Sequence, residues 1–109
     1  MTKRILHVSH HPEGKAPSAD VLRGVLDRAP AWVEYAPRRW LIWTSLSTPT
    51  WYRRFRDVVG KEDNLLIFPV ELNEYEGSLP KIVWGWLRKY SSHDAKADAA
   101  DAVVETADT

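Results

Sequence analysis

The sequence contains no cysteine and no long apolar run, and each absence removes a class of protein. Without cysteine there is no disulfide scaffold, no thiolate metal site and no cysteine nucleophile. No apolar run approaches the roughly 18 residues that a membrane-spanning helix needs. The first residues, Met1–Arg4, are followed by neither an apolar segment nor a cleavage site. We therefore expect a cytoplasmic protein with no signal peptide and no membrane partner.

The composition that remains is that of one small globular domain. The chain has 109 residues, of which 44% are hydrophobic and 28% are charged, and this balance is ordinary for a folded protein. Six tryptophans are many for this length. Each indole buries a large apolar area and carries one N–H that needs a partner. Some of the six are therefore expected at a surface or an interface.

A formal net charge of zero conceals two oppositely charged segments. Residues 1–90 contain 14 Lys and Arg against 10 Asp and Glu, whereas residues 91–109 contain one Lys against five acids. The second segment is rich in Ala and Asp and has no aromatic residue. We expect residues 1–90 to form the domain and residues 91–109 to be a disordered tail.

Apolar periodicity and capping residues predict six regular elements and a short last one. Residues 64–70 are apolar almost throughout, which indicates a strand in the interior of the sheet, although Pro69 marks its end or an exposed edge. Residues 82–87 are read as a final helical turn or a short strand. The expected elements are a strand over 4–10, a helix from Ser18 or Asp20 to Ala29, a hairpin or bulged strand pair at 32–35 and 40–44, a helix over 47–60 and a strand over 64–70.

The order β-α-β-β-α-β predicts an α+β domain of the ferredoxin-like class. Such a domain has a four-stranded antiparallel sheet with two helices on one face. Its other face then needs cover, and a second copy of the chain commonly provides it. We therefore expect a homodimer.

A further set of residues suggests a family. It comprises Trp40–Thr44, a following helix, Asp63–Ile67, Glu71, Gly77 and Trp86–Leu87. This set, within about residues 4–90, resembles the SinR-like branch of the Cas-two superfamily. Members are small ferredoxin-like proteins, usually dimeric, and include CRISPR-associated adaptation proteins and VapD-like ribonucleases. The resemblance implies a dimer that binds nucleic acid.

The resemblance also implies an Asp at the end of the first strand, where the family binds a divalent metal. In this chain His11 stands at that place. A hard cation such as Mg²⁺ prefers carboxylate oxygen to imidazole nitrogen. The metal-dependent nuclease activity of the family is therefore not carried over, and we expect no cofactor.

Three histidines near the end of the first strand keep an enzyme as the alternative. His7 and His11 share one face if the strand runs that far. His10 and His11 are the candidate catalytic residues. His7, His10 and His11 together are the weak candidates for binding a divalent metal such as Zn²⁺. A polar strand end that runs into a loop explains the same residues without a site.

Five arginines among tryptophans form the candidate nucleic-acid-binding set. Bases stack on indoles and phosphates pair with guanidinium groups, so the mixture suits single-stranded nucleic acid. A solvated helix face over a tryptophan-rich core explains the same mixture. The candidate residues are Arg38, Arg39, Arg53, Arg54 and Arg56, with Trp32, Trp40, Trp51 and Tyr52 between them.

Three functional hypotheses follow from these observations. The first is a SinR-like protein that binds nucleic acid or a protein partner and lacks the metal nuclease centre. The second is a metal-dependent endonuclease, in particular an endoribonuclease, that uses the histidine cluster. The third is an interaction module, for example a phage or defence-associated accessory protein. The first is preferred, which makes the protein a binder rather than an enzyme.

Overall fold

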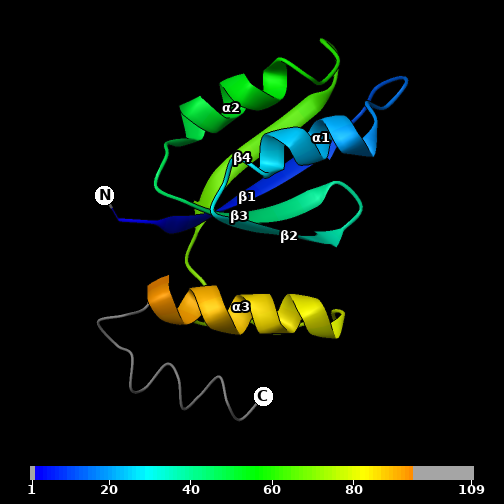
Figure 1. Cartoon of the computed structure of the whole chain (residues 1–109). Helices are drawn as coiled ribbons and strands as arrows, with labels where there is room; N and C mark the ends of the chain where they lie inside the picture. Colours follow the sequence, from blue (N-terminus) through cyan, green and yellow to red (C-terminus); the bar gives the residue numbers. More distant parts are fainter. Residues whose placement is uncertain (1, 95–109) are drawn as a thin grey trace.

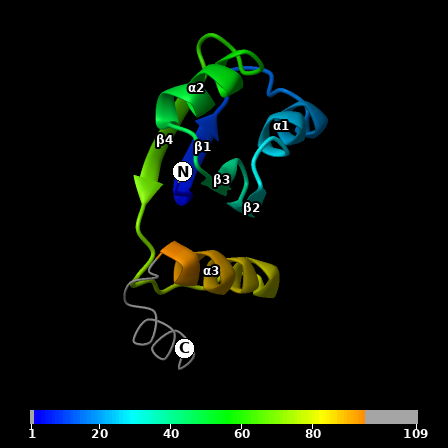
Figure 2. The ribbon, with the colours of Figure 1, turned by 60° about the vertical axis from the view of Figure 1, so that its left-hand side comes forward.

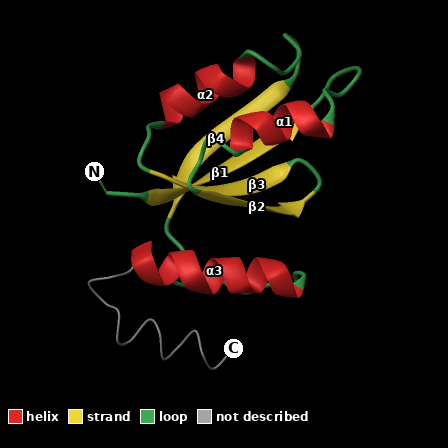
Figure 3. Cartoon of the chain, in the orientation of Figure 1, coloured by secondary structure: helices red, strands yellow, loops and turns green. Residues whose placement is uncertain are grey.

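The computed structural model describes residues 2–94 and contains a four-stranded antiparallel sheet with three helices (Figures 1 and 3). The α+β class and the order of the first six elements are as predicted. The elements are β1 (Arg4–His11), α1 (Ala19–Leu26), β2 (Ala31–Ala36), β3 (Arg39–Thr44), α2 (Thr48–Arg56), β4 (Asn64–Val70) and α3 (Lys81–Asp94).

The strands lie in the order β2-β3-β1-β4, so β1 and β3 are central. Strand β1 pairs with β3 from Arg4 opposite Thr44, and with β4 from Ile5 opposite Val70. The expectation of an interior position for residues 64–70 is wrong, because β4 is an edge strand. A proline that donates no N–H is tolerated at an edge, which explains Pro69. The apolar run did not indicate an edge position, because apolar side chains also stand on the partly exposed face of β4, where Leu66 is 59% exposed.

Helices α1 and α2 lie over the same face of the sheet, as predicted (Figure 2). Each begins at a serine cap, since Ser18 Oγ accepts from the Val21 amide and Ser47 Oγ accepts from the Thr50 amide, both at 3.3 Å. The core beneath them combines alternate strand residues with one apolar stripe from each helix. Its most buried members are Leu6, Val8, Leu26, Trp40, Ile42, Trp51 and Phe55.

Helix α3 lies on the opposite face of the sheet (Figure 1). It is a helix of 14 residues rather than a short strand or a single turn, and it begins where the Val83 amide donates to Pro80 O at 3.0 Å. Val83 and Leu87 pack against Ile5 and Leu41. The chain's own helix thus covers part of the face that was expected to need a second copy.

Helix α3 runs past residue 90, the predicted end of the domain, to Asp94. Residues 91–94 continue the helix and do not belong to a disordered tail. The rest of that tail, residues 95–109, lies outside the described residues. Within residues 2–94, no helix combines the length and the apolar character needed to cross a membrane.

Candidate functional site

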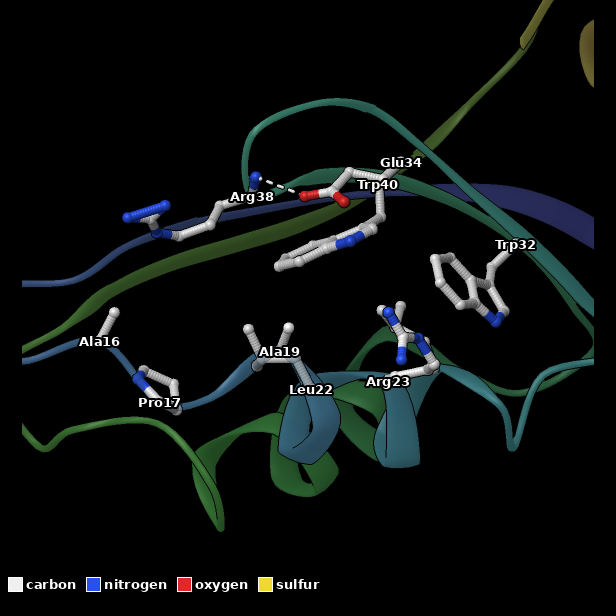
Figure 4. A pocket seen from close by; sticks show the side chains of 10 residues that line it. Ala16, Pro17, Ala19, Leu22, Arg23, Trp32, Glu34, Arg38 and Trp40 are labelled. Carbon is white, nitrogen blue, oxygen red and sulfur yellow. Dashed lines mark hydrogen bonds between the residues drawn. The ribbon is translucent and has the colours of Figure 1, made fainter. Parts of the chain in front are cut away.

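A hollow of ≈ 200 Å³ lies between α1 and the β2–β3 hairpin (Figure 4). Trp32 and Trp40 line it from the sheet, whereas Ala19 and Leu22 line it from the helix. In Figure 4 the Trp40 indole lies across the space from Ala19 and Leu22, and Trp32 lies at one end. The hollow therefore has aromatic surface on one side and small or aliphatic side chains on the other.

Strand register explains why the two tryptophans meet there. Trp40 is the cross-strand partner of Glu34, and directly opposed residues share a face of the sheet. Trp32 lies two residues before Glu34 and therefore points to that face as well. The small residue Ala19 at the start of α1 leaves the space open. A larger side chain there would fill it.

Neighbouring contacts fix both indoles. Trp40 is 3% exposed, and its ring stacks on Phe55 with centroids 6.0 Å apart. Trp32 is half-buried, and its Nε1 donates to Asp27 Oδ1 at 2.9 Å. The aromatic wall is therefore set before any ligand arrives, which lowers the entropic cost of binding.

Three charged side chains line the same hollow, namely Arg23, Glu34 and Arg38. In Figure 4 Arg23 lies near Trp32, while Arg38 extends from the opposite end. The Arg38 backbone is left-handed with φ 56°, and its amide donates to Glu34 Oε2 at 2.9 Å. A left-handed non-glycine residue costs of order 1 kcal/mol. This turn is therefore held by its neighbours, and it places a guanidinium group at the mouth of the hollow.

The five predicted arginines do not gather in one patch. Arg38 lines the hollow, whereas Arg39 lines a separate concavity on the face opposite α1 and α2. Arg53 is exposed on α2. Arg56 is held within the protein, because its Nη2 donates to Gly60 O at 3.1 Å and to Lys61 O at 3.0 Å.

Arg54 packs over the Trp51 ring, 4.9 Å from its centroid. Burial lowers the pKa of Arg54 from its usual value, and the nearby Arg28 guanidinium lowers it further. The distance to the Trp51 ring makes this contact a cation–π interaction at the rim of the core. Of the five arginines, only Arg38 lies at the tryptophan-lined hollow.

The three predicted histidines separate onto two faces of the sheet. Strand β1 runs to His11, so His7 and His11 do share one face, while His10 is buried on the other. Around His7, Tyr35 shares a hydrogen bond of 2.6 Å with Nε2 and Phe68 stacks on the ring. Burial lowers the pKa of His7, and the charge of Arg39 adds to this effect.

His10 instead pairs with Asp63, which the sequence analysis placed in the family pattern but not among the candidate site residues. The distance from His10 Nε2 to Asp63 Oδ2 is 2.8 Å. Asp63 also accepts from the amides of Glu13 at 3.0 Å and Gly60 at 2.9 Å. These hydrogen bonds, with that from Glu13 contributing most, lower the pKa of Asp63 to about 2. The carboxylate joins the loop after β1 to the loop before β4.

The structure does not bring the three histidines together. Among residues 2–94, no group of three or more His, Cys, Asp or Glu side chains could hold a metal ion. His10 is turned toward Asp63, and His7 is turned toward Tyr35. We therefore derive no chemistry through a divalent cation at this cluster.

Residues that the sequence missed were hidden by their separation along the chain. Arg23 reaches the hollow from α1, and Glu34 reaches it from β2. The alternation of β2 and β3 was the available signal, because it places Trp32, Glu34 and Trp40 on one face.

Comparison with known proteins finds no matching family model, no matching curated protein and no matching solved structure.

Proposed function

We propose that the protein has a ferredoxin-like fold and binds single-stranded nucleic acid by holding one base in the tryptophan-lined hollow. The order β-α-β-β-α-β, the sheet order β2-β3-β1-β4 and the placement of α1 and α2 on one face support the fold. Helix α3 is an addition at the end of this unit.

The observation that carries the function is the meeting of two indoles and two guanidinium groups at one hollow. Every base has an aromatic face, and stacking on an aromatic side chain contributes about 1–3 kcal/mol per base. Drug-sized ligands occupy pockets of roughly 300–1,000 Å³. The hollow, at ≈ 200 Å³, is smaller than these pockets. It therefore suits one ring system of a longer ligand, with Arg38 at its mouth beside the phosphate backbone.

Glu34 sets the orientation of that ligand. Its carboxylate repels a phosphate group and accepts from N–H groups, so the base rather than the phosphate enters beside it. One carboxylate oxygen already accepts from the Arg38 amide. The other can accept from the edge of a base.

Fluorescence anisotropy with labelled single-stranded RNA and DNA of about ten nucleotides tests the proposal, with duplexes of the same sequence for comparison. Trp32→Ala should weaken binding about 5- to 150-fold, the equivalent of one lost stacking contact. Trp32→Phe, which keeps an aromatic ring, should retain most of the affinity. Single strands should bind more tightly than duplexes.

An arginine pair provides the matched electrostatic control. Arg38→Gln should weaken binding and reduce the slope of log affinity against log salt by about one. Arg53→Gln removes an exposed charge outside the hollow and should change neither quantity. Equal effects of the two substitutions would contradict binding at this hollow.

The other hypotheses stay predictions. The homodimer, the protein partner, the interaction module and the resemblance to the SinR-like branch have no described contact that favours them. The endonuclease alternative needs His10 or His11 at a reacting group. The His10 side chain is fully buried against Asp63, which leaves only His11 for that role. Base binding is supported by a hollow with several converging side chains and is therefore preferred.

A further inference from the structure

Helix α3 leaves one end of its face of the sheet uncovered. It packs over Ile5 and Leu41, whereas Leu66 is 59% exposed and Phe68 is 38% exposed. This uncovered end lies on the opposite side of the sheet from the tryptophan-lined hollow. A ligand can therefore reach it without entering that hollow.

A second concavity of ≈ 160 Å³ lies on this end, and we call it the β1 cup. Its lining includes Ser9, His11, Arg39, Asn64 and Leu66, together with His10 and Leu65, which belong to the opposite face of the sheet. Ser9 lies between its two cross-strand partners, Arg39 on β3 and Leu66 on β4. His11 lies opposite Asn64 in the next row on the same face. Three neighbouring strands thus bring these side chains together.

The polar side chains of the β1 cup are all able to donate hydrogen bonds. Ser9 supplies a hydroxyl, His11 an imidazole, Arg39 a guanidinium group and Asn64 an amide, whereas the fifth polar side chain, His10, is already paired with Asp63. Among the described residues that line the cup, none is acidic. The neighbouring carboxylate of Asp63 instead accepts from His10, Gly60 and Glu13. The lining of the cup therefore presents donors and the positive charge of Arg39, and the Asp63 carboxylate beside His10 is engaged by three hydrogen bonds.

The Arg39 guanidinium group makes one hydrogen bond to the backbone of its own turn. Its Nη1 donates to Pro37 O at 3.2 Å, which leaves the other guanidinium N–H groups for a ligand. Arg38 and Arg39 follow one another at the β2–β3 turn, yet they line concavities on opposite faces. The turn therefore supplies one guanidinium group to each site.

We propose that the β1 cup binds a phosphate group. A phosphate presents several acceptor oxygens and negative charge, which complement one guanidinium group and three further donors. The phosphate is either inorganic or the terminal group of a nucleic-acid strand. This inference does not depend on base binding in the tryptophan-lined hollow.

Titration of the ¹⁵N-labelled full chain with inorganic phosphate, followed by amide chemical shifts, tests the inference. Sodium chloride at matched ionic strength is the control. The amides of Ser9, His11 and Leu66 should shift saturably with phosphate and not with chloride. Arg39→Gln should weaken binding about tenfold or more, because a charge-assisted contact is lost. Arg53→Gln should leave the affinity unchanged, and the spectrum of each variant reports directly on its fold.

A second arm distinguishes the source of the phosphate. Oligonucleotides with a 5′-phosphate are compared with the same strands ending in a 5′-hydroxyl. Tighter binding of the phosphorylated strand, lost in Arg39→Gln, assigns the cup to a strand terminus. Saturable shifts with inorganic phosphate alone assign it to the free ion. The proposal is overturned by the absence of saturable shifts with inorganic phosphate together with equal affinity for the two strand ends. Equal affinity of the parent and Arg39→Gln also overturns it.

Discussion

The hydroxyl of Thr44 provides a sharp test of how the core is held together. Thr44 is 1% exposed, and its Oγ1 accepts from Trp51 Nε1 and from the Leu46 amide, each at 3.0 Å. Trp51 is fully buried. Thr44→Val preserves the shape and the β-propensity of the side chain and removes the acceptor. Two N–H groups then lose their partner, and the indole cannot turn to water.

The cost of Thr44→Val follows from these contacts. A buried donor left without a partner costs about 1–3 kcal/mol. Leu46 is half-buried, so water compensates for part of the loss at its amide. We therefore expect about 2 kcal/mol of lost stability, which corresponds to a fall in Tm of roughly 10 °C for a domain of this size.

Urea unfolding followed by circular dichroism measures this difference. Thr44→Ser is the matched control, because it keeps the hydroxyl and removes one methyl group. It should be more stable than Thr44→Val although it buries less apolar surface. If Thr44→Val is as stable as Thr44→Ser, the hydrogen bond to Trp51 does not contribute as the structure indicates.

Two further predictions concern titrating groups. Asp63 has a pKa of about 2 against an ordinary 3.8, so its contribution to stability is present above pH 3.8 and lost as pH falls toward 2. Asp63→Asn should lower Tm at neutral pH and flatten the profile between pH 4 and 2, whereas an unchanged profile would contradict the loop contacts. Burial lowers the pKa of His7, so His7 opposes folding as pH falls below its ordinary 6.5. Proton NMR should place the midpoint of His7 below 6.5, and a midpoint at or above 6.5 would contradict its burial.

Local sequence signals were sufficient for most of the scaffold. Ser18 and Ser47 are caps whose contacts lie three residues away, so the starts of α1 and α2 were visible in the sequence. The alternation of β1 likewise predicted that His7 and His11 share a face. Such features depend on backbone geometry alone.

The remaining features depend on contacts between distant segments. The position of β4 at the edge is set by pairing with β1. Pro69 was compatible with an edge, but the apolar run around it indicated an interior strand. Gly85 and the polar residues after Leu87 made α3 look shorter in the sequence than it is. The helix is stabilised by packing on Ile5 and Leu41, which lie far away along the chain. Local propensity does not contain that information.

In the candidate site, too, some features could be predicted from local sequence and others depend on contacts between distant segments. Trp32, Trp40 and Arg38 were selected from the sequence, but only the register places them at one hollow with Glu34. Arg56 was selected for its charge, whereas the structure uses it to hold three carbonyl groups of its own loop. The partner of His10 lies 53 residues away along the chain. No spacing rule connects those two positions.

The affinity ratio between Trp32→Ala and Trp32→Phe for a single-stranded oligonucleotide tests the central claim most directly. Both variants lose the indole N–H that donates to Asp27, so the comparison isolates the aromatic face. The account predicts that Trp32→Phe binds at least fivefold more tightly than Trp32→Ala, with single strands preferred over duplexes. Equal affinities of the two variants, with both folded, would contradict the holding of a base in the tryptophan-lined hollow.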